Sequence, residues 1–306
     1  MKIDSIVKTP FLKSTQKFYI LNNFIWPTLT FPFQCAPLTK LSSGFLNDID
    51  LLTRSAVKEI FELPNDFCSS ILYSPKEFKG LGLKRAQWEA FIQHINISKN
   101  LLLLNDPYII KFQDLRKEIQ ECFDKLQVNI IDFDRINSKT IRKSLQEMEY
   151  LKWKALPQKG RGVALFSDCP IINKKLNNLD GLSESEYKDY LKMVGDVAPV
   201  RGIHGRSKDG IQCRRCSTSE HFIVETLPHV LGNCPFGSLL RNHRHNRIRT
   251  LIANEFRKKK QLEVIEEVTA IADEGSIRRS DIIILDKTKN TGLILDPNVR
   301  FETNED

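Results

Sequence analysis

The sequence CRRCSTSEHFIVETLPHVLGNC at residues 213–234 decides how the second half of the chain folds. It spaces Cys213, Cys216, His229 and Cys234 as C-x2-C-x12-H-x4-C, which supplies three thiolates and one imidazole. Thiolate and imidazole suit Zn²⁺, a borderline-soft ion that structural sites hold with four such ligands. The pattern therefore predicts a CCHC zinc knuckle within residues 201–237.

The other cysteines have a different predicted role. The chain contains seven Cys, and polar residues and a proline interrupt the first apolar stretch, which makes a poor signal peptide. In a reducing compartment, thiols are structural or metal-binding rather than paired in disulfides. His221 is the alternative imidazole ligand, but the spacing to Cys234 favours His229. The remaining four cysteines are predicted to be buried and to pack as small hydrophobic residues: Cys35, Cys68, Cys122 and Cys169.

A basic helix is predicted directly after the knuckle, over residues 239–260. Its inward face carries Leu240, Ile248, Leu251 and Ile252, and helical spacing puts Arg244 and Glu255 on that face too. An inward Glu255 must be paired or hold a metal, so it is a candidate catalytic residue; the alternative is an exposed carboxylate at a frayed helix end. The predicted phosphate-binding residues of this helix and the knuckle are Arg214, Arg215, Arg244, His245, Arg247, Arg249, Lys258, Lys259 and Lys260.

Charge is distributed unevenly along the chain. The formal net charge is +8, yet residues 201–260 hold 13 basic and 4 acidic side chains, whereas residues 261–306 hold 5 basic and 11 acidic ones. A basic block followed by an acidic one indicates a polyanion-binding surface beside a metal–carboxylate site. The alternative is an ordinary solvated basic face.

Three β-branched segments follow the basic helix and are predicted to be strands, at residues 262–271, 278–285 and 291–299. Asp281 opens the second strand and Asp296 lies at the end of the third. A turn at residues 287–290 would bring the two carboxylates to one edge of the sheet. Paired carboxylates bind Mg²⁺, which prefers hard oxygen ligands together with substrate phosphate. The alternative is that both are ordinary surface residues.

The first two hundred residues are predicted to be mostly helical. Apolar residues recur at helical spacing in 45–61, 85–96, 115–126 and 141–156, and Ser183 with Glu186 forms a capping box that opens a helix ending at Val194. In the segment before residue 45, the prolines at 27, 32 and 37 are expected to break the chain into short helical pieces. No apolar run approaches the ~18 residues of a membrane span. The fold class is therefore mixed: an α-helical N-terminal part, a knuckle and a small α/β domain.

The order of these elements resembles the C-terminal half of a non-LTR retrotransposon polyprotein, of the clade that inserts into ribosomal RNA genes and carries a restriction-like endonuclease. The matching segments are the knuckle residues Cys213–Cys216, Glu225–His229 and Asn233–Cys234, the Arg-His-Asn at 244–246, the Arg-Ser-Asp at 279–281 with Asp296, the linker Val197–Arg201, and a thumb-like stretch at 19–83 with Ile25–Pro27 and Gly80–Leu83. The resemblance implies a reverse-transcriptase thumb at 1–105, a helical linker at 106–200, the knuckle at 201–237 and a truncated endonuclease at 238–306.

The resemblance also implies a function. The parent protein would nick target DNA and use the freed end to prime reverse transcription of its RNA. Asp281 and Asp296 would then hold Mg²⁺, while Arg244 and His245 would grip the DNA backbone. The expected partners are target DNA, element RNA and further copies of the chain, in the nucleus and without a membrane.

Two departures from the family pattern set the expected activity. Ser280 stands where the family has Pro, and Asn298 stands where a nuclease of this type places Lys. The chain is therefore expected to be a fragment that binds DNA with little or no nicking. The alternative is a non-catalytic, zinc-stabilised nucleic-acid-binding protein, either domesticated or a degraded copy.

Overall fold

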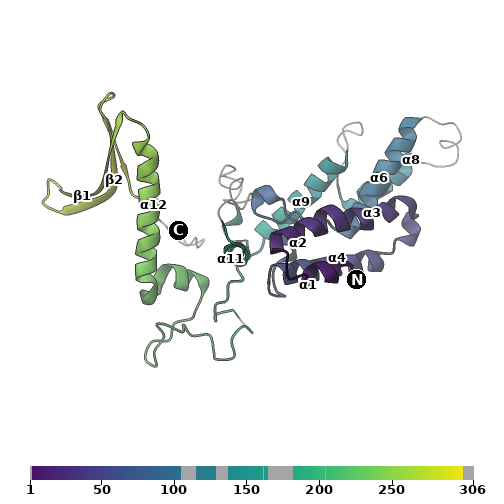
Figure 1. The fold of residues 1–306 in the computed structure, drawn as a ribbon, viewed down its shortest axis with the longest axis horizontal. Helices are drawn as coiled ribbons and strands as arrows, with labels where there is room; N and C mark the ends of the chain where they lie inside the picture. Colours follow the sequence, from purple (N-terminus) through teal and green to yellow (C-terminus); the bar gives the residue numbers. More distant parts are fainter. Residues whose placement is uncertain are drawn as a thin grey trace. The chain divides into compact units, whose positions relative to one another are not determined.

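The computed structural model describes residues 2–104, 115–128, 137–160, 162–164, 182–203 and 205–298. The chain divides into two compact units, Met1–Ala198 and Pro199–Asp306 (Figure 1). The first is helical and the second combines a helix with a small antiparallel sheet, so the mixed fold class is confirmed. Among the described helices, none is both long and apolar enough to cross a membrane.

The described part of the first unit is helical. Its elements are α1 (Lys2–Lys8), α2 (Ser14–Ile20), the π-turn η1 (Leu21–Ile25), α3 (Trp26–Cys35), η2 (Leu38–Lys40), α4 (Ser43–Ile60), α5 (Ser69–Tyr73), η3 (Lys76–Phe78), α6 (Ala86–Leu104), α8 (Leu115–Leu126), α9 (Ser138–Lys154) and α11 (Glu184–Val194). The predicted helices therefore form, with ends shifted by a few residues.

Aromatic and aliphatic side chains from these helices share one core. Trp26, Phe61 and Trp153 are among its largest fully buried members. The apolar stripe of α8 is buried along its whole length, as its helical spacing predicts. Cys122 belongs to that stripe and burial raises the pKa of its thiol to about 12. Cys35 is exposed, which corrects its prediction, and Cys169 lies outside the described residues.

Of the three prolines predicted to break this segment, Pro27 and Pro32 lie within helical structure, and Pro37 follows the end of α3 at Cys35. Helical structure continues from Ser14 to Cys35, with the π-turn at Leu21–Ile25 joining α2 to α3. Pro27 lies in the first turn of α3, where a missing N–H costs little because the wider turn before it already changes the hydrogen-bonding pattern. Pro32 lies inside α3.

Buried charges fix how the helices of this unit pack. The carboxylate of Asp50 in α4 is 1% exposed and accepts a hydrogen bond of 2.6 Å from the backbone N–H of Ala86, at the start of α6. Glu89 in α6 accepts bonds of 2.6 and 2.8 Å from the guanidinium of Arg142 in α9. Because each buried charge has a partner, these contacts hold α4, α6 and α9 in a defined arrangement.

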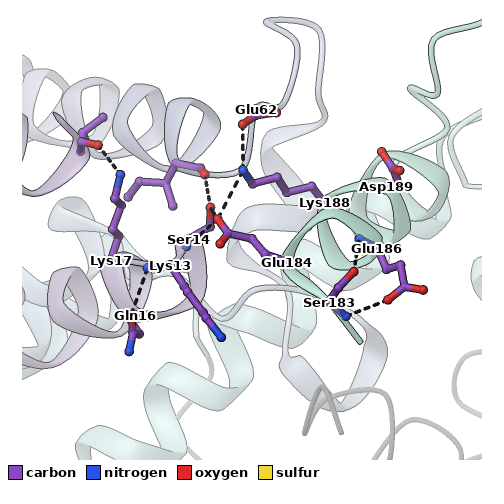
Figure 2. Close-up of polar contacts among 12 residues, drawn as sticks. Lys13, Ser14, Gln16, Lys17, Glu62, Ser183, Glu184, Glu186, Lys188 and Asp189 are labelled. Atoms are coloured by element: carbon purple, nitrogen blue, oxygen red, sulfur yellow. Dashed lines mark hydrogen bonds and ion pairs between the residues drawn. The ribbon is translucent and has the colours of Figure 1, made fainter. Parts of the chain in front are cut away.

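The last helix of the first unit, α11, is fastened to α2 and α4 by polar contacts (Figure 2). Ser183 and Glu186 form the predicted capping box. Glu184 accepts a 3.0 Å bond from the backbone N–H of Ser14, whose Oγ lies 2.6 Å away. Lys188 pairs with Glu62 at 2.7 Å, just after the end of α4. α11 is therefore a structural part of the first unit.

The second unit begins with a loop region at 199–237, which includes η5 (His229–Asn233) and η6 (Pro235–Gly237), and continues into α12 (Ser238–Arg257). Three antiparallel strands follow in the order β1 (Leu262–Ile271), β2 (Ile277–Asp286) and β3 (Thr291–Leu295). The three predicted strands therefore form, but the third ends at Leu295, and Asp281 lies inside β2 and does not open it.

The inward face of α12 differs from the prediction. Ala253, Ile252 and Phe256 pack against the sheet, around the buried Ile282 and Ile284. The predicted inward residues Leu240 and Leu251 are 76% and 59% exposed. Leu240 lies in the first turn of the helix, away from the sheet, and Leu251 lies two positions from the buried Ala253, on the opposite side of the helix.

Candidate metal centre and nucleic-acid interface

The four predicted metal ligands lie together in the second unit. One ligand atom from each of Cys213, Cys216, His229 and Cys234 is within 4.8 Å of all the others. His229 Nε2 lies 3.1 Å from the Sγ of Cys216. Ligands at tetrahedral positions around a Zn²⁺ ion lie about 3.3–3.8 Å apart, so the group has the size to hold one metal ion. The alternative ligand His221 is not part of the group.

Backbone hydrogen bonds place the four ligands. Gln212 and Val224 form an antiparallel bridge, and the N–H of Cys213 donates to the carbonyl of Ile223 at 2.7 Å. A turn after Cys213 brings Cys216 back beside it. On the other side of the site, the π-turn His229–Asn233 closes with a 2.7 Å bond from the N–H of Cys234 to the carbonyl of His229. Each half of the group is therefore fixed by its own local structure.

The thiols of this group influence one another's ionisation. Burial opposes ionisation of Cys213, but hydrogen bonds from the backbone N–H groups of Arg215 and Cys216 outweigh it and lower the pKa of Cys213 to about 6. Burial, with the neighbouring Cys213 and Cys234, raises the pKa of Cys216 to about 12. Several thiolates this close are unfavourable without a cation, so the arrangement suits a metal ion that stabilises all of them.

Glu225 is not one of the four ligands but holds the backbone beside Cys213, a role that the sequence patterns did not reveal. Its carboxylate is 2% exposed and accepts bonds from the backbone N–H groups of Arg201 and Arg214. The Arg214 guanidinium adds two more bonds, at 3.0 and 2.7 Å. Burial alone would raise the pKa of Glu225, but these contacts lower it to about 2. Arg214 therefore holds Glu225 while its own side chain stays 53% exposed, and its role in binding phosphate stays a prediction.

The basic helix α12 is attached to the metal-ligand group. Arg241 donates a 2.7 Å bond to the carbonyl of Cys234, and Arg244 donates a 3.4 Å bond to the carbonyl of Leu231. The Nε of Arg244 is buried and has no hydrogen-bond partner among the described residues. Arg241 and Arg244 thus fix the first half of α12 to the segment that carries His229 and Cys234.

The basic side chains of this region fall into two groups. Arg249 is only 11% exposed and pairs with Glu266 and Glu267 of β1, so it serves the packing of α12 on the sheet and not the surface, contrary to the prediction. Lys258 pairs with Glu255 at 2.6 Å. Arg214 and Lys258 are exposed but paired with Glu225 and Glu255, and the other exposed cations of the predicted interface are Arg215, Arg247, Lys259 and Lys260.

Asp281 and Asp296 meet beside α12. Asp281 lies 3.1 Å from Nε2 of His245 and is hydrogen-bonded to Asp296. Burial raises the pKa of Asp281, but its bonds with Asp296 and His245 outweigh burial and lower it, while the pKa of Asp296 is raised by its bond to Asp281. Two carboxyl groups in contact oppose ionisation of both, which accounts for the raised pKa of Asp296.

The strand pairing around Asp281 is locally distorted. The ladder passes from Glu266–Ile282 to Val268–Ser280 and leaves Glu267 and Asp281 unpaired, with Glu267 at a φ of 56°. Two carboxylates facing each other across strands repel. Arg249 and Arg279 pair with Glu267, while His245 contacts Asp281, so basic side chains surround this point.

Glu255 does not join this acidic cluster in the predicted way. Its side chain is 70% exposed and pairs with Lys258 at the end of α12, so its predicted inward placement is wrong. Lys287 is directed elsewhere too, because it pairs with Glu263 at 2.8 Å. Asn298 is exposed.

Comparison with known proteins gives no assignment. No family model matches the chain, and no curated protein matches it.

Proposed function

We propose that the second unit is a zinc-stabilised nucleic-acid-binding module. The observation that carries this proposal is that the Cys₃His group directly precedes α12. Arg241 and Arg244 of that helix donate hydrogen bonds to the segment that carries His229 and Cys234. Three thiolates and one imidazole complete a closed tetrahedral Zn²⁺ site, which leaves no open position for catalysis at the metal. The zinc would therefore act by holding a basic helix in a fixed orientation.

The exposed cations of this module would contact phosphates. Arg215 lies in the knuckle, Arg247 lies in α12, and Lys259 and Lys260 follow that helix. Such contacts release condensed counterions, so binding weakens steeply as salt increases. The proposed ligand is nucleic acid, with the target DNA and element RNA of a non-LTR retrotransposon as the specific partners that the sequence resemblance suggests.

The experiment combines metal analysis with nucleic-acid binding. Purified chain is expected to contain one Zn²⁺, and Cys213→Ser is expected to lose both the metal and most of the binding to duplex DNA. Cys68→Ser is the matched control, because that cysteine lies in the first unit. Protein that contains no zinc but binds DNA as tightly as before would overturn the proposal.

A second candidate function is Mg²⁺-dependent nicking of DNA, favoured by the contact between Asp281 and Asp296. A divalent cation between them would stabilise the ionised form of both, and each carboxylate would supply one oxygen ligand. His245 would orient Asp281. In this proposal the chain belongs to the retrotransposon endonucleases and acts in the nucleus.

This second candidate lacks a positioned lysine. Lys287 follows the last residue of β2, about 20 Å along the chain from Asp281 at ~3.3 Å per residue, and pairs with Glu263. Asn298 carries no charge. Loss of such a cation costs about a thousandfold in rate, so we expect DNA binding with little nicking. Strong Mg²⁺-dependent nicking of a plasmid that Asp281→Ala abolishes would contradict that expectation.

A further inference from the structure

A cavity of about 310 Å³ lies in the first unit, outside the segment that carries the metal ligands. Its walls come from α2 and η1, from the segment between Lys76 and Lys84, and from α11. Ligand pockets begin at about this size, so the cavity suits one small molecule with a single ring system and not a large cofactor.

The rim of the cavity is basic. Lys76, Lys79 and Lys84 line it, and no acidic side chain is among the described residues of its walls. Burial lowers the pKa of Lys84, which indicates that its ammonium group is only partly solvated. The nearby carboxylate of Glu89 is already bonded by Arg142 at 2.6 and 2.8 Å. An anionic group bound at the rim would therefore be favoured.

The lysines are carried by a tightly constrained turn. Lys79 and Gly82 have left-handed backbone angles, with φ of 63° and 62°. A Cβ on Gly80 would lie 2.2 Å from the carbonyl oxygen of Ser74, so only glycine fits there. The turn therefore holds its lysines in place before any ligand binds, and less ordering is needed on binding.

The interior of the cavity is aromatic. Phe61 packs between Phe18 and Tyr187, with ring centroids 5.4 and 5.6 Å apart, and Tyr187 stacks on Tyr190 at 6.0 Å. Burial raises the pKa of Tyr187 to about 12, so the phenol stays neutral. Phe18 and Phe61 are buried beneath this layer, whereas Tyr187 and Tyr190 are half-buried and present the apolar surface on which a heteroaromatic ring can stack.

One polar atom in the wall has no partner. Asn22 lines the cavity and is 8% exposed, and its Oδ1 is buried without a hydrogen bond to any described residue. A buried acceptor of this kind is unfavourable unless a donor reaches it. A ligand with an N–H group that donates to this oxygen would therefore be favoured, and nucleobases carry such groups on their edges.

Tyr19 extends the aromatic surface to the outside. Its ring is 60% exposed at the edge of the cavity and contacts Phe24, also 60% exposed, with centroids 6.1 Å apart. Exposed aromatic rings beside lysines are the arrangement on which unpaired bases stack while cations contact the backbone.

A larger cavity of about 640 Å³ in the same unit lacks this combination. Its charged side chains compensate one another, since Glu149 pairs with Lys152 at 2.7 Å and lies 3.8 Å from Arg85. It has no comparable requirement for an anion.

We infer that the smaller cavity binds a nucleotide, with the base against Tyr187 and Tyr190, an N–H of the base donating to Oδ1 of Asn22, and the phosphate at Lys76 and Lys84. The nucleotide is either free or the unpaired end of a single strand, with Tyr19 stacking on the next base. This site is separate from the zinc-dependent module, so the two proposals fail independently.

The test is calorimetric titration of the full-length, zinc-loaded chain with nucleoside 5′-monophosphates. Binding is expected for the nucleotide but at least about tenfold weaker for ribose 5-phosphate, which lacks the base, and for adenosine, which lacks the phosphate. Short 5′-phosphorylated single strands distinguish a free nucleotide from the end of a strand as the ligand. They are titrated into a variant that carries Arg247→Gln, Lys259→Gln and Lys260→Gln, which reduces binding at α12. Tighter binding of the strand than of the monophosphate identifies a strand end as the ligand.

Two variants separate recognition from folding. The pair Lys76→Gln and Lys84→Gln is expected to weaken nucleotide binding at least about tenfold, while Lys139→Gln, an exposed lysine of α9, leaves it unchanged. Asn22→Leu is expected to weaken binding similarly and to leave the melting temperature unchanged or higher, because it removes an unsatisfied buried acceptor. Equal affinity for the nucleotide and ribose 5-phosphate, or unchanged affinity in both variants, overturns the inference.

Discussion

At the scale of single residues, a carboxylate that is not itself a ligand holds the backbone of the Cys₃His group in place. Glu225 accepts bonds from the backbone of Arg214, between Cys213 and Cys216, and from Arg201 at the start of the second unit. Glu225→Gln is expected to weaken Zn²⁺ retention about tenfold, as loss of groups that orient metal ligands does. Competition with a chelator measures the affinity. Glu220→Gln, an exposed acid in the same loop, should behave like the original chain, and equal retention by both variants would contradict this role.

A second prediction at this scale concerns Glu184 and acid. Hydrogen bonds from Ser14 lower the pKa of Glu184 to about 2, below the ~4.3 of an unfolded Glu. A carboxyl group with a lowered folded-state pKa stabilises the fold above the unfolded pKa and loses that contribution as pH falls from about 4.3 towards 2. Because the side chain is 33% exposed, we expect Glu184→Gln to cost about 1 kcal/mol of unfolding free energy at pH 7.

Denaturant titrations of the original protein and of Glu184→Gln at several pH values measure this difference in unfolding free energy. It should shrink towards zero near pH 2, whereas Asp189→Asn on the same helix should cost little at any pH. A cost for Glu184→Gln that is the same at pH 7 and pH 3 would show that ionisation of Glu184 contributes nothing.

At the scale of elements, the sequence predicts best where one local rule decides the outcome. Ser183 and Glu186 identify the start of α11, and the stripe from Leu115 to Leu126 identifies the buried face of α8. The face of α12 could not be predicted in this way. Its apolar residues form no single stripe, and contact with the sheet buries Ala253 and Arg249 in preference to Leu240 and Leu251. Which cations are paired likewise depends on strands that follow α12 in the chain.

The pairing of cations along α12 leads to a prediction about salt. Arg247, Lys259 and Lys260 are exposed, and neutralising all three to Gln should flatten the dependence of log affinity on log salt by about two to three, at ~0.7–0.9 per lost phosphate contact. Lys287→Gln, which removes an exposed lysine paired with Glu263, is the matched control and should leave the slope unchanged. Binding of DNA across a salt series measures both slopes, and an equal slope in the triple variant would place the interface elsewhere.

At the scale of the whole molecule, the two units differ in what stabilises them. The first buries a large shared core that includes Trp26, Trp88 and Trp153, the three tryptophans of the chain. The described part of the second buries a much smaller apolar cluster around Ala253, Ile282 and Ile284. A unit with so small a core needs another source of stability, and metal binding at the proposed Cys₃His site would supply one.

Removal of zinc should therefore unfold one unit and leave the other intact. Tryptophan fluorescence reports the first unit alone, because all three tryptophans lie there, and we expect it to stay unchanged when a strong chelator is added. Trypsin reports the second unit, since its basic residues between Arg201 and Lys260 become cleavable once the Cys₃His group loses its metal. Added Zn²⁺ should restore protection, and Mg²⁺ should not, because thiolates bind it poorly. If the chelator instead changes tryptophan fluorescence together with cleavage, folding of the first unit depends on the metal too; if it changes neither, the second unit is stable without it.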